Sequence, residues 1–311
     1  MWPFVSVIMP AYNAEKYIAS AIESILNQTY ENFELIIVED CSVDKTLEVI
    51  RRYSADSKLK LTQNERNKGI AYSTNRGMDY AKGKYIALMD DDDIAVRERL
   101  ELQVNYLEKY TEIDILGGRS NDIDSQGGLI RRGNVPKYNP KYIKATLLFQ
   151  GMAFRNGTTM MRRYFIDRYH LRYQENCYGM QDLKFFIDSS KVGNISSIGD
   201  LLLYYRIHGD NETKRRRQDY KEERKQKYAE FQRESLKASG FELDEGKLSI
   251  INKAFAEYDG GCENREDLQL LYEAFCEIMG QARNMAIDYY GELEHYCKLK
   301  LSEQVKSLIC F

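Results

Sequence analysis

Four consecutive aspartates at positions 90–93 are the residues of this chain that stand out most for chemistry. Adjacent carboxylates repel one another, so burying them together costs free energy unless a cation neutralises them. Oxygen ligands of this kind suit Mg²⁺ or Mn²⁺, which bind a few protein carboxylates together with substrate phosphates. The alternative is a solvated acidic turn that pairs with Arg97 and Arg99 at the start of the next helix, and the run taken alone favours that alternative.

Four other polar residues stand beside predicted elements and could act on a substrate. Asp40 follows an apolar run, where it could accept a hydrogen bond from a nucleobase or ribose, or simply favour a helix start. Asp182 is either a general base or an ordinary acidic residue at a helix N-terminus, and this pattern alone favours the latter. Arg206 and His208 follow another apolar run, where arginine could hold phosphate and histidine a metal ion.

Two common phosphate-binding motifs do not occur in the sequence. The first strand is not followed by G-x-G-x-x-G, and there is no G-x-x-x-x-G-K-[ST]. Dinucleotide binding of the usual kind and P-loop chemistry are therefore not expected. If phosphates are bound, a metal ion and cationic side chains must bind them.

The elements that must position these side chains alternate between strand and helix over the first ninety residues. Buried strands are predicted from apolar runs at 5–9, 33–38, 59–61 and 85–89. Helices are predicted from apolar spacing at about 18–26, 42–53 and 71–81. Asn13 is placed to cap the first helix. This alternation predicts an α/β fold with a mostly parallel central sheet flanked by helices.

In an open sheet of this kind, ligands bind outside the carboxyl ends of the strands. The segments 10–13, 39–42 and 90–93 should therefore converge on one crevice. Beyond a mixed middle section, the chain becomes charged and helical after residue 213, where we place a domain boundary. Apolar stripes in the last helices predict a core or, as the second choice, a homodimer interface.

The composition limits the classes of function and the compartment. The 311 residues carry 45 Lys and Arg against 48 Asp and Glu, which does not favour a nucleic-acid-binding protein. Six scattered cysteines indicate a reducing compartment, and no run approaches the ~20 apolar residues of a membrane span, so we expect a cytoplasmic protein. The basic segment 214–227 is either a solvated helix face or a peripheral contact with an anionic membrane surface.

Taken together and in order, these segments resemble family 2 glycosyltransferases with the GT-A fold. The resemblance covers about residues 4–212 and does not extend into the tail. The segments that carry it are VSVIMPAYN (5–13), SILNQTY (24–30), LIIVEDCS (35–42), NKGI (67–70), AKGKYI (81–86), DDDD (90–93), GMQD (179–182) and YRIHG (205–209). It implies a GT-A glycosyltransferase domain over 1–212 and a helical C-terminal region over 213–311.

The resemblance implies binding roles for residues that match the family's donor site. Asp40 corresponds to the aspartate that contacts the uracil or ribose of a nucleotide-sugar donor. Pro10, Ala11 and Tyr12 line the nucleoside pocket. Arg206 is assigned to the same donor-binding set, and so is Asp91, which stands where a small residue is usual.

The resemblance also implies a metal site and a catalytic base. Asp90 and Asp92 match the ends of the D-x-D motif, through which Mn²⁺ or Mg²⁺ meets the diphosphate. His208 lies where some members supply a further metal or diphosphate contact. Asp182 matches the base of inverting members, and Gln181 replaces the glutamate that often precedes it. The stretch 151–159 has the composition of a loop near such a site.

One backbone departure is also implied. Cys41 stands where family members commonly have glycine, which makes a left-handed backbone there less favourable. The activity implied is transfer of a sugar, expected from a UDP-sugar, to a glycan or lipid-linked glycan hydroxyl, in bacterial-type surface polysaccharide synthesis. The alternatives are a nucleotidyltransferase of similar fold and a non-catalytic module that binds nucleotide sugars.

Overall fold

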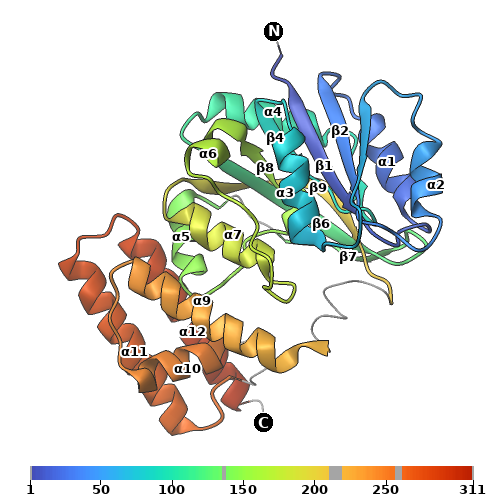
Figure 1. The fold of residues 1–311 in the computed structure, drawn as a ribbon. Coiled ribbons are helices and arrows are strands. Elements are labelled where there is room, and N and C mark those ends of the chain that lie inside the picture. The colour runs from blue at the N-terminus through green and yellow to red at the C-terminus, as the bar shows by residue number, and fades with distance from the viewer. Residues whose placement is uncertain (1, 135–137, 210–218, 256–260, 310–311) are drawn as a thin grey trace. The chain divides into compact units, whose positions relative to one another are not determined.

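The computed structural model describes residues 2–134, 138–209, 219–255 and 261–309 (Figure 1). The chain forms two compact units, neither of which is continuous in sequence. The first unit comprises Met1–Tyr138, Ala153–Asn176 and Val192–Asn211. The second comprises Asn139–Met152, Cys177–Lys191 and Glu212–Phe311. The boundary expected near residue 213 lies outside the described residues.

The first unit is built on one mixed sheet with the strand order β3-β2-β1-β4-β8-β6-β9-β5. Its parallel half consists of β1 (Val5–Ala11), β2 (Phe33–Glu39), β3 (Leu59–Gln63) and β4 (Tyr85–Leu88). The other strands are β5 (Ile94–Ala95), β6 (Ile115–Ile123), β7 (Leu129–Arg131), β8 (Met160–Arg162) and β9 (Ile195–Arg206). β8 is antiparallel to both β4 and β6, whereas β6 and β9 run parallel. β7 pairs with β6 at its edge.

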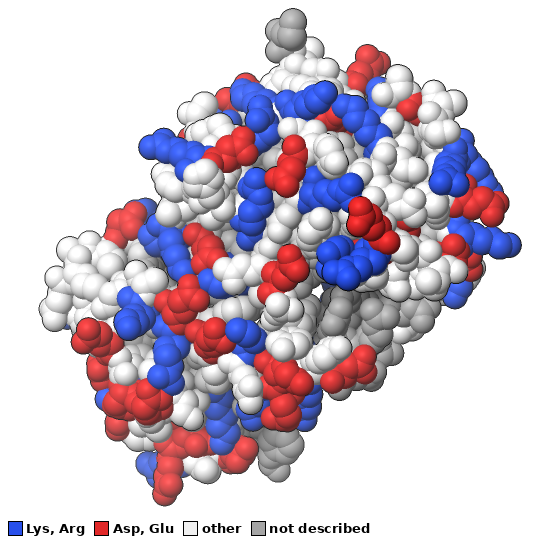
Figure 2. Space-filling view, in the orientation of Figure 1, with Lys and Arg blue, Asp and Glu red and all other residues white. Residues whose placement is uncertain are grey.

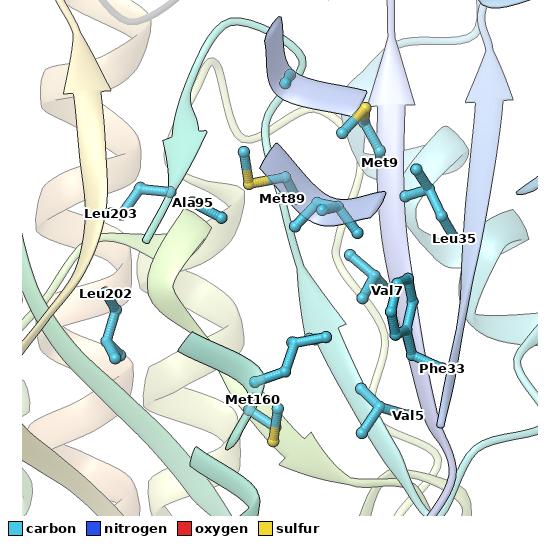
Figure 3. Close-up of a cluster of buried hydrophobic side chains, with 14 of the residues drawn as sticks. Val5, Val7, Met9, Phe33, Leu35, Met89, Ala95, Met160, Leu202 and Leu203 are labelled. Atoms are coloured by element: carbon cyan, nitrogen blue, oxygen red, sulfur yellow. The ribbon is translucent and has the colours of Figure 1, made fainter. Parts of the chain in front are cut away.

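Helices cover both faces of the parallel half, as the apolar runs predicted. The helices of this unit are α1 (Ile18–Leu26), α2 (Thr46–Arg51), α3 (Ile70–Tyr80), α4 (Arg99–Lys109) and α6 (Arg163–Arg168). Alternate residues of β1 point to opposite faces. Val5, Val7 and Met9 join the main core cluster with side chains of α1, α2 and α4, and Figure 3 shows them along β1 beside Leu35.

On the opposite face, α3 approaches the sheet at a glycine. A Cβ atom on Gly77 would lie 2.4 Å from Cγ2 of Ile8 and 3.4 Å from Cγ2 of Val38. Real side chains do not approach as closely as the first of these distances. Only glycine therefore lets α3 lie at its observed distance from β1 and β2.

A buried carboxylate joins the strands away from their carboxyl ends. Oε1 of Glu34 accepts hydrogen bonds from Oγ of Ser6 (2.5 Å) and from the backbone N–H of Lys82 (3.0 Å), and Oε2 accepts one from Lys60. Burial acts to raise the pKa of Glu34, but the hydrogen bonds from Lys60 and Ser6 outweigh it, so that pKa is lowered. The folded state therefore favours the ionised carboxylate.

The second unit is helical. Its helices are α5 (Pro140–Leu147), α7 (Gln181–Ser190), α9 (Lys221–Ala238), α10 (Glu245–Phe255), α11 (Arg265–Asn284) and α12 (Tyr290–Ile309). Phe149, just after α5, lies at the centre of its core, with its ring 4.9 Å from that of Phe255, 5.7 Å from Phe275 and 5.8 Å from Tyr296. The stripe of Leu271, Ala274 and Ile278 on α11 is buried in this core.

The surface is of mixed charge on the face shown in Figure 2, where Lys and Arg side chains are interspersed with Asp and Glu. Of the basic segment expected at 214–227, residues 214–218 lie outside the described part of the chain, and 221–227 form the first turns of α9. Among the described helices, none combines the length and the apolar character that a membrane span requires.

Candidate functional site

The carboxyl ends of β1 and β2 lie side by side, as expected for neighbouring parallel strands. The backbone N–H of Asp40 donates to the carbonyl oxygen of Ala11 (2.8 Å), and both residues are buried. Pro10 pairs with Val38 in the register of the two strands. Tyr12 follows and is more exposed than its neighbours in β1.

Asp40 closes the loop that leads into α3. Its Oδ1 accepts hydrogen bonds from Nδ2 of Asn64 (2.6 Å) and the backbone N–H of Lys68 (2.8 Å), and its Oδ2 accepts one from the N–H of Gly69 (2.7 Å). Gly69 has a φ of 85°, which glycine adopts without strain. The carboxylate therefore holds the loop before α3 against the end of β2, and its role toward a nucleoside stays a prediction.

Two backbone expectations for this edge are wrong. Asn13 has a φ of 51°, and its Oδ1 accepts a hydrogen bond from the N–H of Val43 (2.9 Å) rather than capping a helix. The helix α1 begins later, at Ile18. Cys41 adopts a φ of 59°, the left-handed conformation that its side chain makes less favourable. Cross-loop hydrogen bonds such as that of Asn13 hold these turns against their local preference.

Strand pairing brings the aspartates to the end of β9. Ile94 pairs with Tyr204 and Ala95 with Leu203 in antiparallel register. The residues just before β5 must then lie opposite the residues just after Tyr204. Oδ1 of Asp93 accepts a hydrogen bond from the backbone N–H of Arg206 (2.8 Å) accordingly.

The other aspartates contact two different loops. Oδ2 of Asp91 accepts a hydrogen bond from the N–H of Tyr12 (2.9 Å), which joins the ends of β1 and β4. Oδ2 of Asp92 lies 2.9 Å from Nε2 of His208. The structure therefore brings Tyr12, Asp91, Asp92 and His208 together at one edge of the sheet, from segments far apart in the sequence.

Arg206 is buried, and its guanidinium contacts backbone carbonyl oxygens. Its Nε donates to the carbonyl oxygen of Asp92 (2.8 Å), and its Nη1 lies 3.3 Å from those of Asp124 and Ser125. Its guanidinium lies 4.9 Å from the ring of Tyr17. Tyr17 also lies 4.7 Å from the imidazole of His208, measured between ring centroids. The phosphate contact expected of Arg206 stays a prediction.

The aspartate run concentrates negative charge in a buried place. Burial and, next, the charge of Asp92 raise the pKa of Asp91 well above its usual range, and they raise that of Asp93 in the same way. Within the described residues, Oδ2 of Asp93 is buried and has no hydrogen-bond partner. Arg99 is fully buried nearby, and burial lowers its pKa to about 10, but its Nη2 donates to the carbonyl oxygen of Leu88 (2.7 Å).

The side chains at this edge include donor types that a divalent cation accepts. Asp90, Asp92 and His208 offer carboxylate oxygens and an imidazole nitrogen, which are donors that Mg²⁺ or Mn²⁺ accepts. Gly157 leaves room beside Asp90 and Asp93, since a Cβ there would lie 3.0 Å from Oδ2 of Asp90 and 3.4 Å from Oδ2 of Asp93. In the described part of the chain, no three His, Cys, Asp or Glu side chains already form a ligand set. Other ligands would have to come from the substrate or water.

One neighbour of the aspartates, Arg155, is not among the predicted site residues. Arg155 places its guanidinium 3.6 Å from the ring centroid of Tyr205 and donates to Oδ1 of Asp122 (2.7 Å). Its positive charge acts to lower the pKa of Asp93, although burial dominates. The composition of 151–159 suggested a loop near the site, and Gly157 confirms that its second half lies beside the aspartates. Nothing local in the sequence distinguishes Arg155 from other surface arginines.

Asp182 belongs to the second unit. It stands in the first turn of α7, where its Oδ1 accepts a hydrogen bond from the N–H of Leu183 (2.8 Å). A carboxylate at a helix N-terminus is stabilised in its ionised form by the helix dipole. The remaining predicted site residues lie in the first unit. The base role of Asp182 stays a prediction.

Comparison with known proteins agrees with this architecture. A family model described as Glycosyl transferase family 2 matches residues 6–170. An uncharacterized glycosyltransferase of Haemophilus influenzae is 37% identical over 217 residues, which cover 67% of this chain and 67% of that protein. The UDP-Glc:alpha-D-GlcNAc-diphosphoundecaprenol beta-1,3-glucosyltransferase WfgD of Escherichia coli is 45% identical over 105 residues, which cover 34% of this chain and 41% of WfgD.

A solved structure matches nearly the whole chain. Staphylococcus aureus TarS 1-349 in complex with UDP-GlcNAc aligns with 98% of this chain and 89% of that chain, with a TM-score of 0.65 and 18% sequence identity. At this identity the likeness shows the fold alone. The expected GT-A-type α/β fold, with a mostly parallel central sheet and C-terminal helices, is confirmed.

Proposed function

Because the chain belongs to glycosyl transferase family 2, we propose that it moves a sugar from a UDP-sugar donor to a hydroxyl of a glycan or lipid-linked glycan. The transfer inverts the anomeric carbon and serves synthesis of a bacterial-type surface polysaccharide in the cytoplasm. The WfgD match supports a UDP-sugar donor and a diphospholipid-linked acceptor, since its name states both. TarS, which was solved with UDP-GlcNAc, supports the same class of donor.

One observation supports this proposal most strongly: the grouping of Tyr12, Asp91, Asp92 and His208 at one edge of the sheet. These residues come from the ends of β1, β4 and β9. A site outside the carboxyl ends of central strands is where α/β folds bind ligands. We therefore propose that the donor nucleotide lies along this edge, with Pro10, Ala11 and Asp40 at its nucleoside end.

Negative charge at this edge must be neutralised, because the leaving group is a diphosphate. A bound Mn²⁺ or Mg²⁺ would offset the charge that grows on that diphosphate, and Asp90, Asp92 and His208 are the residues that would hold it. Gly157 keeps the space beside Asp90 open. Arg155 is a cationic side chain close to Asp93, and it limits the negative field there.

Asp182 supplies the base in this proposal. The acceptor oxygen forms a bond to the anomeric carbon while the bond from that carbon to the diphosphate oxygen breaks. The electron pair of the broken bond leaves with the nucleoside diphosphate. The hydroxyl proton passes to the carboxylate of Asp182, a contribution typically worth ~10²–10⁴-fold in rate.

A donor and acceptor screen tests the function. Purified protein is incubated with UDP-glucose, UDP-GlcNAc or UDP-galactose, with Mn²⁺ or with EDTA, and with a synthetic GlcNAc-diphospholipid acceptor. We expect UDP release and a heavier lipid product with at least one donor, and neither in EDTA. Release of pyrophosphate from a sugar phosphate and UTP would instead indicate a nucleotidyltransferase. Tight UDP-sugar binding without any turnover would indicate a non-catalytic module.

A further inference from the structure

The turn that leads into α7 has an unusual backbone. Tyr178 has a φ of 50° and Gly179 a φ of 82°, so two successive residues are left-handed. Glycine adopts this conformation freely, but tyrosine does not, and such residues persist only where their surroundings hold them. The N–H of Met180 then donates to the carbonyl oxygen of Cys177 (2.9 Å), and α7 begins at Gln181. The direction of the first turn of α7, which carries Asp182, depends on this turn.

Arg224 of α9 holds the turn at its least favourable residue. Its Nη1 donates to the carbonyl oxygen of Tyr178 (2.5 Å), and the arginine is only 4% exposed. The ring of Tyr220, just before α9, lies 5.4 Å from the ring of Tyr178. A buried guanidinium is costly to place and rigid once its hydrogen bonds are made. Two residues at the start of α9 therefore contact both the carbonyl and the side chain of Tyr178.

The same helix holds the other end of α7. Oε1 of Glu234 accepts hydrogen bonds from Nζ of Lys184 (2.8 Å) and from Nζ of Lys191 (2.9 Å). Both lysines also donate to Oδ1 of Asp188. Lys184 is buried, so its charge must keep these partners. Helix α9 thus contacts the turn before α7 through Arg224, and through Glu234 it contacts Lys184 within α7 and Lys191 just after α7.

We propose that α9 is a positioning element for catalysis and that Arg224 sets the orientation of the Asp182 carboxylate. This inference rests on the proposed function, because it requires Asp182 to be the base. Arg224 does not touch the reacting atoms in this scheme. It acts through Asp182 by fixing the turn from which α7 starts, and Glu234 prevents α7 from rotating about that fixed point. The C-terminal helices are then part of the acceptor-activating machinery.

The test is a double-mutant cycle between Arg224 and Asp182, with a matched control on the same helix. The variants are Arg224→Gln, Asp182→Asn, the double variant and Arg233→Gln. Arg233 also lies on α9, but its guanidinium pairs with Glu245 of α10 (2.6 Å) and not with the turn. The readouts are kcat and donor KM with UDP-glucose and the GlcNAc-diphospholipid, UDP affinity by calorimetry, and the melting temperature.

We expect Arg224→Gln to lower kcat at least tenfold while donor KM and UDP affinity stay within about twofold of the parent values. In the Asp182→Asn background the same substitution should have no further effect on kcat, because a residue that acts through another loses its influence once the other is removed. Arg233→Gln should leave kcat unchanged. Arg224→Lys keeps a cationic donor and should therefore lower kcat less than Arg224→Gln does.

Several outcomes would overturn the inference. Equal fold-losses for Arg224→Gln in the parent and in the Asp182→Asn background would show a purely structural effect. An unchanged kcat in Arg224→Gln beside an inactive Asp182→Asn would remove Arg224 from the mechanism and leave the proposed base intact. Full activity of Asp182→Asn would instead remove the base itself. If Arg224→Gln does not fold, the milder Arg224→Lys completes the same cycle, with the same outcomes deciding.

Discussion

The imidazole of His208 meets the carboxylate of Asp92 at 2.9 Å between Nε2 and Oδ2, although 116 positions separate them in the chain. This contact joins the loop after β4 to the end of β9. Both side chains are mostly buried, with 10% and 19% of their surface exposed. Asp92 of this pair is therefore the target of the first substitution.

Asp92→Ala should remove metal-dependent binding of UDP. The substitution deletes a carboxylate that we propose as a cation ligand, and we expect at least a tenfold loss of UDP affinity in Mn²⁺, given that even supporting residues of metal sites typically contribute about 10–100-fold. Calorimetry with and without EDTA measures the effect. Asp79→Ala, which removes an exposed carboxylate paired with Arg172, is the control. Equal UDP binding by parent and Asp92→Ala under both conditions would contradict the metal assignment.

Asp182→Asn should reduce transfer by about 10²–10⁴-fold and leave UDP affinity nearly unchanged. The amide keeps the size of the side chain but cannot take a proton from the acceptor. Steady-state rates with saturating donor measure the loss, and calorimetry measures the affinity. Asp167→Asn on α6 is the control, because that carboxylate is half exposed and pairs with Arg163. Parent-like turnover in Asp182→Asn would mean that another group accepts the proton.

Gly157→Ala should lower the affinity for UDP while changing the melting temperature little. The added methyl group would lie 3.0 Å from Oδ2 of Asp90 and 3.2 Å from Cδ2 of Leu203, so Asp90 must shift. We expect UDP affinity in Mn²⁺ to fall about tenfold, or ~1.4 kcal/mol. Gly280→Ala on α11 is the control, since no atom lies within 4 Å of the place that its new methyl group would take. A large fall in melting temperature with unchanged affinity would point to packing alone.

Gly77→Ala should destabilise the first unit by about 1–3 kcal/mol, the usual cost of forcing an extra methyl group into a packed core. The methyl group would meet Cγ2 of Ile8 at 2.4 Å. Urea unfolding measures the free energy of unfolding. The single substitution Ile8→Val is the control, because it keeps Cβ branching but shortens the side chain. If Gly77→Ala is as stable as the parent, α3 is not held at its distance from β1 by this contact.

The carboxylate of Glu34 should make the fold sensitive to acid. Its pKa is lowered in the folded state, so the unfolded chain binds the proton more readily, and the stabilisation is present above the unfolded pKa near 4.5 and lost as the pH falls through the folded pKa. Glu34→Gln should lower the free energy of unfolding by about 1–3 kcal/mol at neutral pH. The difference in stability between this variant and the parent should become smaller on acidification. Melting temperatures between about pH 7 and pH 3, the range over which such carboxylates titrate, measure it.

The control for this pH experiment is Glu48→Gln, which removes an exposed carboxylate paired with Arg52 on the surface of α2. Surface pairs of this kind contribute at most ~1 kcal/mol. Its melting curve should follow that of the parent at every pH. A constant difference between Glu34→Gln and the parent across the whole range would show that the ionisation of Glu34 does not contribute to stability.

The parallel half of the sheet could be predicted because each strand there carries its own signal. Continuous apolar runs mark β1, β2 and β4, and the helices α1 and α3 that lie between them in the chain each bury one face. The carboxyl-end rule predicted that the segments 10–13, 39–42 and 90–93 converge. The hydrogen bonds from Tyr12 to Asp91 (2.9 Å) and from Asp40 to Ala11 (2.8 Å) confirm that these segments meet. In this part of the chain, the elements expected from the local apolar pattern agree with the observed arrangement of strands.

The other half could not be predicted because its arrangement depends on pairing between distant segments. The three residues of β8 lie between β4 and β6 and run antiparallel to both, and a strand that short gives no periodic signal. The contact of Arg155 with Tyr205 of β9 likewise joins segments that are far apart in the sequence. The left-handed backbone at Cys41 was missed for a related reason, since tertiary hydrogen bonds override the preference of a single residue.

The discontinuous second unit has a consequence for the nascent chain. Helix α5 and Phe149 leave the ribosome before α11 and α12, which supply Phe275 and Tyr296 around that ring. Phe275 and Tyr296 follow Phe149 by 126 and 147 residues. At roughly 5–20 residues per second, Phe149 waits on the order of ten seconds for these neighbours. During that interval an aromatic surface is open to chaperones and to self-association. Slow translation of the segment between Phe149 and Tyr296 would lengthen the exposure.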